Sequence, residues 1–305
     1  MNKTLLLGGN GYIGSALYSK LDADSVDLCF YGKDLGYSIK KNFNDISDSE
    51  ISKYDSIILL AGHSSLQMCE YNKQNAWLNS VDYFHNLCEK ISNDQLLIYA
   101  SSASVYGQTD KFCSENDINI EPVNHLDLIK LTIDIIANKF INEGKNIIGL
   151  RFGTVNGYSP NIRSDLMINS MVYNCKKHGF IETTNDWIKR PILGTEDLVR
   201  AVVHILEHKK VYSGQYNLCS ENSTVKDIAE TVSKKLGCEI VKKSNLNKVY
   251  DFQIDTKKFE DIYDFKFNQS ISSIIDTLID IDINLFNNKG ERFHDRLFDS
   301  YIQKL

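Results

Sequence analysis

Hydrophobic residues along this chain follow two alternating patterns. Short continuous apolar runs are typical of strands buried on both faces, whereas apolar residues that recur every three or four positions are typical of helices with one buried side. The continuous runs predict strands at residues 3–7, 26–31, 56–61, 96–101 and 146–152. The recurring pattern predicts helices at residues 15–21, 77–91 and 126–141. This alternation predicts an α/β protein with a doubly wound parallel sheet covered by helices on both faces.

A glycine-rich turn follows the first predicted strand. Gly8, Gly11 and Gly14 are spaced as GxxGxxG and lead into the first predicted helix. Glycines permit a tight turn and close approach of a ligand, and the start of a helix offers free N–H groups and a positive dipole end. A plain turn is the alternative, but strand, turn and helix in this order favour a dinucleotide site. Tyr12 and Ile13 lie within the same segment and are further candidate cofactor contacts.

The residues after the second predicted strand bear on which dinucleotide is bound. An acidic side chain about twenty positions past the glycines holds the ribose 2′-hydroxyl in NAD sites, whereas a basic group favours the 2′-phosphate of NADP. The chain has Lys33 followed by Asp34 in this region. Lys33 favours NADP and Asp34 leaves NAD open, so the expected cofactor is NAD or NADP, with a small preference for NADP.

Composition narrows the class of protein. The chain has 305 residues, of which 42% are hydrophobic and 24% charged, as is ordinary for a soluble globular enzyme. A net charge of −6 argues against a nucleic-acid partner held by positive charge. No apolar run reaches membrane-spanning length, and the start of the chain fits a strand and a glycine turn better than a signal peptide. We therefore expect a cytoplasmic protein without a membrane partner.

The seven cysteines are scattered singly, without a CxxC pair. This pattern favours reduced, mostly packed thiols over a disulfide framework or a zinc cluster. The segment from His204 to His208 matches an HxxEH zinc-site pattern. It also continues a helical pattern that ends in lysines, so two histidines near a helix C-terminus are the better explanation. We expect no metal site.

Several motifs occur in an order that resembles one family. They are GGNGYIG at residues 8–14, Asp45-Ile46, Leu60-Ala61-Gly62, SSASVYG at residues 101–107, LRFGTVNGYSP at residues 150–160, RPILGTEDLVRA at residues 190–201 and GQYNL at residues 214–218. Together they make the chain similar to the extended short-chain dehydrogenase/reductases that act on nucleotide sugars as epimerases, dehydratases and reductases. The similarity extends from residue 3 to about residue 279.

The resemblance implies a catalytic pair on the helix that follows the strand at residues 96–101. In this family a Tyr-x-x-x-Lys pair performs the proton chemistry, the lysine also binds the nicotinamide ribose, and a serine hydrogen-bonds the same sugar oxygen. By the family's spacing the serine is Ser102 and the lysine is Lys130, but the tyrosine position holds Leu126. Leucine neither donates nor accepts a proton, so the expected general base is missing.

Four other side chains are candidates for the missing proton donor. Tyr106 ranks first, because it comes from the strand end that lies near the sugar pocket in relatives. His125 ranks second because it titrates near neutrality. On a helix, however, it is rotated by about 100° from residue 126 and would not point in the same direction. Cys113 and Glu115 lie on the loop that follows Tyr106 and could also reach inward.

The resemblance also assigns ligand contacts. Arg190 lies where relatives bind the nucleotide diphosphate, which a bidentate guanidinium suits, although a surface ion pair is the alternative. The expected cofactor contacts beyond the glycine turn are Lys33, Asp45, Ile46, Leu60, Ala61, Gly62 and Lys130, and the expected contacts of a nucleotide-sugar substrate are Ser102, Arg163, Asn169 and Arg190.

The family's architecture implies two interleaved lobes. Residues 1–155 with about 190–217 would form a dinucleotide-binding Rossmann domain. Residues of about 156–189 with 218–305 would form a smaller, discontinuous substrate lobe that ends in an extra C-terminal helix. A homodimer through the helices at residues 77–91 and 126–141 is also implied.

Two functions remain open. The first is an NAD(P)-dependent nucleotide-sugar epimerase, dehydratase or reductase with an atypical proton donor. The second is a catalytically degenerate relative that binds a dinucleotide or nucleotide sugar as a sensor or partner subunit. Ser102, Lys130 and Arg190 favour the first, and Leu126 favours the second.

Overall fold

A seven-stranded parallel sheet forms the centre of the computed structural model, which describes residues 3–28, 33–109, 111–117, 120–243 and 250–286. The strand order is β3-β2-β1-β4-β5-β7-β11. The strands are β1 (Thr4–Leu7), β2 (Ala23–Asp27), β3 (Ile39–Lys40), β4 (Ser56–Leu59), β5 (Leu96–Ser102), β7 (Asn146–Phe152) and β11 (Gly214–Leu218). The order reverses between β1 and β4, as in a doubly wound Rossmann sheet. The predicted fold class is confirmed.

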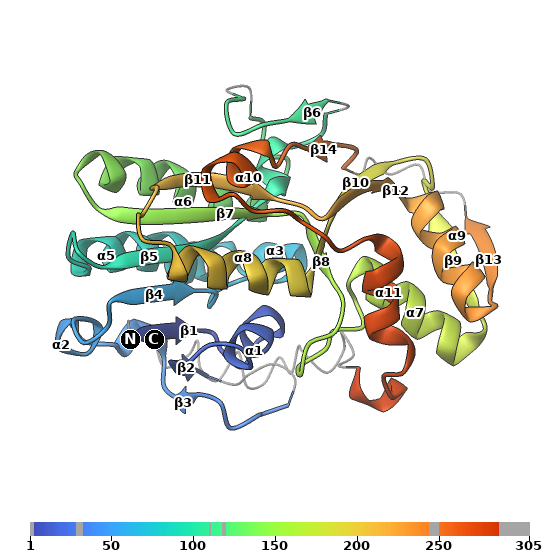
Figure 1. Cartoon of the computed structure of the whole chain (residues 1–305), viewed down its shortest axis with the longest axis horizontal. Helices are drawn as coiled ribbons and strands as arrows, with labels where there is room; N and C mark the ends of the chain where they lie inside the picture. The colour runs from blue at the N-terminus through green and yellow to red at the C-terminus, as the bar shows by residue number, and fades with distance from the viewer. Residues whose placement is uncertain (1–2, 29–32, 110, 118–119, 244–249, 287–305) are drawn as a thin grey trace.

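Helices cover both faces of this sheet. Leu5 and Leu7 of β1 join one apolar cluster, and Leu6 joins a second cluster on the opposite face, because side chains alternate along a strand. The first cluster is covered by α3 (Leu66–Tyr71), α4 (Lys73–Trp77), a π-helical turn (Leu78–Asp82), α5 (Tyr83–Lys90) and α6 (His125–Asn142). The second is covered by α1 (Tyr12–Tyr18), α8 (Thr195–Glu207) and α10 (Lys257–Tyr263), of which α8 lies in front of the sheet in Figure 1.

A smaller part of the molecule lies beyond the carboxyl ends of the central strands, on the right of Figure 1. Its strands are β8 (Thr154–Asn156), β9 (Phe180–Thr184), β10 (Lys189–Gly194), β12 (Glu221–Thr224) and β13 (Glu239–Lys243), and its helices are α7 (Met167–His178), α9 (Val225–Leu236) and α11 (Ile271–Ile279). β10 pairs with β8 and β12, and β9 pairs with β13. The three helices enclose a separate apolar core. The chain therefore enters this part more than once.

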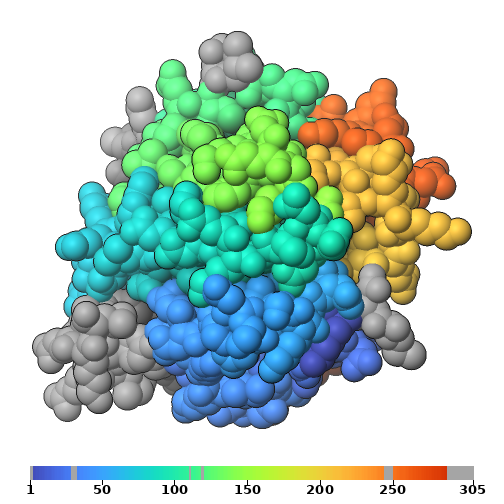
Figure 2. Space-filling view, turned by 90° about the vertical axis from the view of Figure 1, so that its left-hand side faces the viewer, coloured from blue at the N-terminus to red at the C-terminus, as the bar shows by residue number. Residues whose placement is uncertain are grey.

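The remaining short elements are α2 (Asp48–Ile51), β6 (Phe112–Cys113), β14 (Gln253–Ile254) and three 3-10 turns (Phe43–Asp45, Ala103–Tyr106 and Ile283–Leu285). Figure 2 looks at the molecule from the left-hand side of Figure 1, toward the amino ends of the central strands. There the surface runs from blue at the bottom to green at the top, in the order of the strands. Ligand-binding clefts in such sheets lie at the opposite, carboxyl ends.

The second strand and the first helix lie earlier in the chain than predicted. The second strand begins at Ala23 and ends at Asp27, whereas the apolar run placed it at residues 26–31, of which 29–31 lie outside the described part of the chain. The strand begins with polar side chains, so a search for apolar runs does not detect its start. These side chains find partners elsewhere in the fold; the hydroxyl of Ser25, for example, lies 2.8 Å from that of Ser38. α1 begins three residues earlier than predicted, because Gly11 caps it inside the turn itself. The helix predicted at the end of the chain falls on residues 287–305, outside the described residues.

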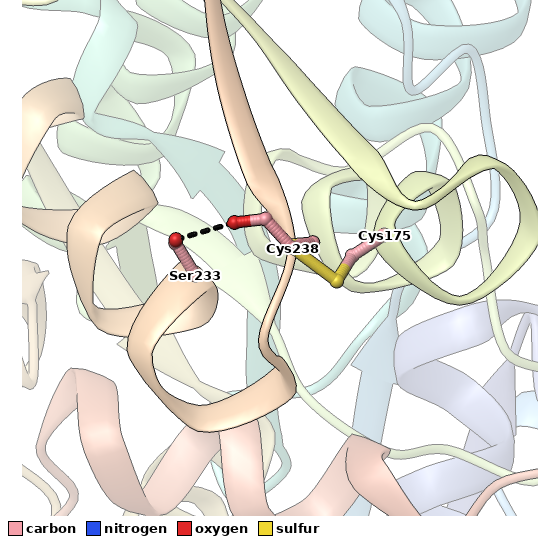
Figure 3. Close-up of a disulfide and its surroundings, with 3 residues drawn as sticks. All are labelled: Cys175, Ser233 and Cys238. Atoms are coloured by element: carbon pink, nitrogen blue, oxygen red, sulfur yellow. Dashed lines mark hydrogen bonds between the residues drawn. A yellow bond between two sulfur atoms is a disulfide. The ribbon is translucent and has the colours of Figure 1, made fainter.

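Cys175 and Cys238 form a disulfide, which Figure 3 shows between α7 and the chain just after α9. The Cα atoms are 5.7 Å apart, although the residues are separated by 63 positions in the sequence. The Ser233 hydroxyl donates to the Cys238 carbonyl oxygen at 2.6 Å and orders the end of α9 beside it. The expectation of reduced thiols is therefore wrong for this pair, because the packing of α7 on α9 brings them together. Cys69, Cys88, Cys113 and Cys219 are free and buried.

No described helix combines the length and the apolar composition needed to cross a bilayer. The described residues also hold no group of three or more His, Cys, Asp or Glu side chains arranged for a metal ion. Of the histidines in the HxxEH segment, His204 has Nε2 2.7 Å from the carbonyl oxygen of Tyr263, and His208 has Nδ1 2.9 Å from that of Lys210.

Candidate active site

The turn after β1 brings bare backbone to the carboxyl end of the sheet. Gly8 has a φ of +98°, and a Cβ on it would lie 2.7 Å from the backbone nitrogen of Ala61. A Cβ on Gly14 would lie 2.0 Å from the carbonyl oxygen of Gly8. Gly11 caps α1 without a side-chain hydrogen bond, and the first N–H groups of a helix have no partner inside it. This close, side-chain-free turn has the geometry that a phosphate group requires.

A cleft of about 280 Å³ opens beside this turn. The ends of β4 and β5 and the first turns of α6 contribute to its lining, together with the segment that follows β8. The predicted site residues that line it are Gly8, Gly11, Tyr12, Ile13, Gly14, Leu60, Ala61, Gly62, Ser102, Lys130 and Arg163. Residues that are far apart in sequence thus meet at the carboxyl ends of parallel strands, as expected for a ligand site in this kind of sheet.

α6 contributes Leu126, Lys130 and Ile133 to the lining of the cleft, and the first two are one turn apart. The Asn124 side chain caps the helix by accepting a hydrogen bond from the backbone N–H of Asp127 at 3.0 Å, so α6 begins at His125. Leu126 and Lys130 both line the cleft, because residues four apart share a helix face. Lys130 Nζ donates to the carbonyl oxygen of Ala100 at 2.7 Å, and burial lowers the pKa of this lysine.

Ser102 ends β5 and reaches the cleft from the other side. Its Oγ accepts a hydrogen bond from the backbone N–H of Ser104 at 3.1 Å, which caps the 3-10 turn that follows. The two hydroxyl oxygens are 2.8 Å apart. Ser102 is half-buried and lines the cleft, so one end of this hydroxyl pair faces any ligand there.

Tyr106, the first candidate for the missing proton donor, does not line the cleft. Its hydroxyl donates to Asn217 Oδ1 at 2.9 Å and accepts from Arg151 Nη1 at 2.9 Å. Burial raises its pKa to about 12, against the lowering effect of the nearby Arg151 guanidinium. The residue is 4% exposed, so the structure places it in a buried network beneath the sheet edge.

Three further candidates also lie outside the cleft lining. The His125 backbone N–H donates to Glu70 Oε1 at 3.1 Å, and its Nε2 lies 3.1 Å from the carbonyl oxygen of Lys73. Glu115 accepts a hydrogen bond from the backbone N–H of Asn217 at 2.7 Å. Burial raises the pKa of Glu115, and it raises that of the Cys113 thiol to about 11.

The end of β2 beside the glycine turn is arranged differently from the expectation. The backbone N–H of Asn10 donates to Asp27 Oδ2 at 2.9 Å, which places a carboxylate at the end of β2 beside the turn. Lys33 approaches this region through its backbone, because its carbonyl oxygen accepts from Asn10 Nδ2 at 2.9 Å. Asp27 was missed because the strand was predicted to end at residue 31. Had the strand been predicted to end at residue 27, the acidic residue at its end would have been a candidate contact of the ribose.

The other predicted ligand contacts are spread over the molecule. Asp45 is exposed and Ile46 is buried in the core behind β1, and neither lines the cleft. Arg163 forms a bidentate ion pair with Asp165, at 2.9 and 2.7 Å. Asn169 is fully buried, and its Oδ1 accepts from the backbone N–H of Gly157 at 2.9 Å, so it holds the segment after β8 in place.

Arg190 lies on β10 outside the cleft lining. Its guanidinium is 5.5 Å from the ring centroid of Tyr250, and its Nε is buried without a hydrogen bond to the described residues. Burial lowers the pKa of this arginine. An incompletely paired guanidinium can accept an anionic ligand at low cost, because the charge is already desolvated.

His63 lines the cleft and is not among the residues expected there from the sequence. It is 5% exposed, and burial lowers its pKa to about 4, so its imidazole is neutral at pH 7. Its position directly after Leu60-Ala61-Gly62 was the available signal, because that motif follows the end of β4 at the same sheet edge.

The comparisons with known proteins agree with this architecture. The sequence profile of the NAD dependent epimerase/dehydratase family matches residues 4–219. ADP-L-glycero-D-manno-heptose-6-epimerase of Brachyspira hyodysenteriae is 25% identical over 221 residues, which cover 66% of this chain and 68% of that protein.

Solved structures show the same fold. UDP-glucuronic acid 4-epimerase from Bacillus cereus, in complex with UDP-glucuronic acid and NAD, superposes with a TM-score of 0.79 at 20% identity, covering 91% of this chain and 98% of that one. An NAD-dependent NDP-hexosamine 5,6-dehydratase of tunicamycin biosynthesis gives a TM-score of 0.81 at 18% identity, covering 93% and 100%. With the family profile matching more than two thirds of its length, the chain belongs to the NAD-dependent epimerase/dehydratase family.

Proposed function

We propose that this protein is an NAD(P)-dependent enzyme that epimerises, dehydrates or reduces a nucleotide-linked sugar, with a proton donor other than tyrosine. The observation that carries the proposal is the cleft in which the glycine turn, Ser102 and Lys130 meet. The named activities of the family and of the similar proteins support the same class of reaction. Leu126, in the same cleft, supports the unusual proton donor.

Each lining group has a role in this proposal. The backbone of Gly8, Gly11 and Tyr12 would hold the cofactor pyrophosphate. Glycine at position 8 lets the turn close, because a Cβ there would lie 2.7 Å from the backbone nitrogen of Ala61. Lys130 would bind the nicotinamide ribose and Ser102 a sugar hydroxyl. A bound oxidised nicotinamide would supply a hydride acceptor for a sugar carbon, and the hydroxyl on that carbon would then have to release a proton. Arg163 and Arg190 would contact the substrate diphosphate, and Arg163 would then exchange part of its pairing with Asp165.

For the dinucleotide we propose NAD, in place of the preference for NADP expected from Lys33. The Asp27 carboxylate lies beside the glycine turn at the end of β2. There it would accept a hydrogen bond from a ribose hydroxyl of NAD and repel the 2′-phosphate of NADP. Titration calorimetry with both dinucleotides tests this. We expect the wild type to bind NAD more tightly than NADP. The difference between the two affinities should be smaller in Asp27→Asn, which removes the negative charge. Equal affinities in the wild type would contradict it.

The reaction is tested with a panel of nucleotide sugars, with NAD and NADP, and with mass spectrometry and proton NMR of the products. An epimerised, dehydrated or reduced product from the wild type supports the enzyme. A silent wild type beside an active Leu126→Tyr variant would instead support the second candidate, a degenerate relative that binds its ligands without turnover. The aliphatic side chain of Leu126 in the cleft is the observation that favours this alternative.

We also propose a homodimer built on the helices of one face. Leu66 on α3, Leu78 in the π-helical turn, and Leu128 and Ile135 on α6 are exposed apolar residues of this helical layer. Burying them between two copies would remove apolar surface from water. Sedimentation velocity of the wild type and of Ile135→Asp tests this: a monomeric wild type would contradict it. The lobe boundaries and the cytoplasmic location stay predictions.

A further inference from the structure

Asp127 is a buried carboxylate on the turn of α6 that carries Leu126. It is 0% exposed. Its Oδ2 accepts hydrogen bonds from the side-chain amide of Asn124 at 2.8 Å, from the backbone N–H of Val123 at 3.3 Å and from the hydroxyl of Tyr250 at 2.5 Å. Its Oδ1 is buried and has no hydrogen bond of normal geometry to the described residues. A buried carboxylate oxygen without a complete hydrogen bond is costly, so a nearby donor is expected to serve it.

A pair of hydroxyls leads from this oxygen to the cleft. The Ser104 hydroxyl lies close enough to the Asp127 carboxyl to lower its pKa as a hydrogen-bonding group. The same hydroxyl is 2.8 Å from that of Ser102, which lines the cleft. Because a hydroxyl donates one proton while it accepts another, Ser102 and Ser104 can pass a proton in either direction.

We propose that Asp127 is the proton acceptor and donor for the substrate hydroxyl, acting through Ser104 and Ser102, in the role that Leu126 cannot perform. The proposal rests on the proposed function, because it needs a sugar hydroxyl at Ser102. Asp127 touches neither substrate nor cofactor, so it is a relay residue rather than a catalytic residue.

The proton transfer is balanced along the chain of oxygens. The substrate O–H bond breaks and its proton goes to Ser102 Oγ, the Ser102 proton moves to Ser104 Oγ, and the Ser104 proton moves to Oδ1 of Asp127. The carboxylate becomes a neutral acid, and the substrate oxygen becomes a carbonyl oxygen. The hydrogen on the sugar carbon leaves with two electrons for the oxidised nicotinamide of the proposed function. The reverse sequence returns the proton when the carbonyl is reduced.

The surroundings of Asp127 suit a group that changes its charge during the reaction. Burial raises its pKa, while Tyr250, Ser104 and the N–H groups at the start of α6 act in the lowering direction. The Arg190 guanidinium lies 5.5 Å from the centroid of the Tyr250 ring, whose hydroxyl bonds Asp127, and the Cys69 thiol of α3 is also within electrostatic range. A carboxyl held between these opposing effects can both take up and release a proton.

Three variants of the full-length protein test the relay. Asp127→Asn removes the acceptor with little change in shape, Ser104→Ala interrupts the path, and the double variant Leu126→Tyr/Asp127→Asn offers a direct proton donor instead. Asp227→Asn is the matched control, because Asp227 occupies the same third position of α9, where it bonds its capping residue Thr224. Turnover, its pH profile, and the binding of NAD and nucleotide sugar are measured for each variant. Infrared difference spectra follow the protonated carboxyl during a pH titration.

We expect Asp127→Asn and Ser104→Ala to slow turnover by about 100-fold or more, the range of general acid–base catalysis, with binding nearly unchanged. The wild-type rate should rise with pH as Asp127 loses its proton, and this limb should be missing in Asp127→Asn. Leu126→Tyr should recover much of the rate lost in Asp127→Asn, which a purely structural defect would prevent. One protonated-carboxyl band of the wild type should be absent in Asp127→Asn. In Ser104→Ala the same band should titrate with its midpoint at a higher pH.

Two outcomes would overturn the relay, and they separate it from the proposed function. If the wild type converts a nucleotide sugar and both single variants match its rate and pH profile, the relay is wrong and the proposed function stands. If the wild type binds nucleotide sugars and converts none, both are wrong. Should circular dichroism show that Asp127→Asn is unfolded, Ser104→Ala decides the question, because its small surface change leaves the cap of α6 intact.

Discussion

Leu126 and Lys130 lie one helical turn apart on α6, and both side chains line the cleft beside the glycine turn. Lys130 is held toward the sheet by the carbonyl oxygen of Ala100. An aliphatic group therefore lies next to the ammonium group at the position where the family spacing places a phenol. The cleft therefore keeps the polar groups that ligand binding needs. Proton transfer, in contrast, needs a group other than residue 126.

Leu126→Tyr should introduce a phenol with a lowered pKa. An ordinary tyrosine titrates at about 10, and a cationic group on the same helix face one turn away favours the phenolate. The ultraviolet difference spectrum between the variant and the wild type, followed against pH, measures this value directly. Lys234→Tyr is the control, because Lys234 is exposed on α9, outside the cleft and outside the proposed dimer surface, and should give an ordinary phenol. Equal titration of the two phenols would show that residue 126 does not face Lys130.

Lys130→Met should weaken cofactor binding and leave the fold intact. The change keeps the length of the side chain but removes a charge-assisted hydrogen-bond donor, whose loss costs about 1.5–3 kcal/mol. This corresponds to an affinity lower by about 10- to 100-fold, measured by calorimetry with NAD. Lys139→Met, on the exposed part of the same helix, is the control, since Lys139 pairs with Glu143 at 3.4 Å, lies over the Phe140 ring and does not line the cleft. An unchanged affinity in Lys130→Met would exclude the ribose role.

Removing the disulfide should destabilise the smaller part of the molecule. Cys175→Ser should lower the free energy of unfolding by about 2–4 kcal/mol, because the crosslink restricts the unfolded chain. A reductant should lower the melting temperature of the wild type in the same way and have no further effect on Cys175→Ser. A wild-type melting temperature that is indifferent to reductant would mean that the two thiols are unpaired in solution.

His63 should make the protein less stable in mild acid. Its folded pKa of about 4 lies below the ordinary value near 6.5, so between these two pH values the unfolded chain binds more protons than the folded one. Stability should therefore be fully present above about pH 6.5 and fall as the pH decreases toward 4, by at most about 3 kcal/mol for the whole shift. Urea unfolding at several pH values measures this. His63→Gln should flatten the dependence in this window, and an equal slope in both proteins would contradict the assignment.

Much of the fold could be predicted from local patterns. The strand at residues 146–152 has the predicted bounds, and α6 begins one residue from the predicted start. These elements have long apolar patterns that their own residues determine, independent of partners. β2 was misplaced because its first residues are polar and are satisfied by groups elsewhere, such as Ser38. The hydrophobic pattern of one segment cannot show hydrogen-bond partners that come from other parts of the chain.

For the site, the sequence by itself determined the glycine turn, the polar groups at the strand ends and the leucine in the tyrosine position. Tertiary structure alone decided which of these groups meet: it buried Tyr106 against Arg151, kept His125 out of the cleft and placed Ser104 between Ser102 and Asp127. It also joined Cys175 to Cys238 across 63 positions. The physical reason is that spacing sets the direction of a side chain relative to its own helix or strand, whereas contacts between elements depend on how the whole core packs.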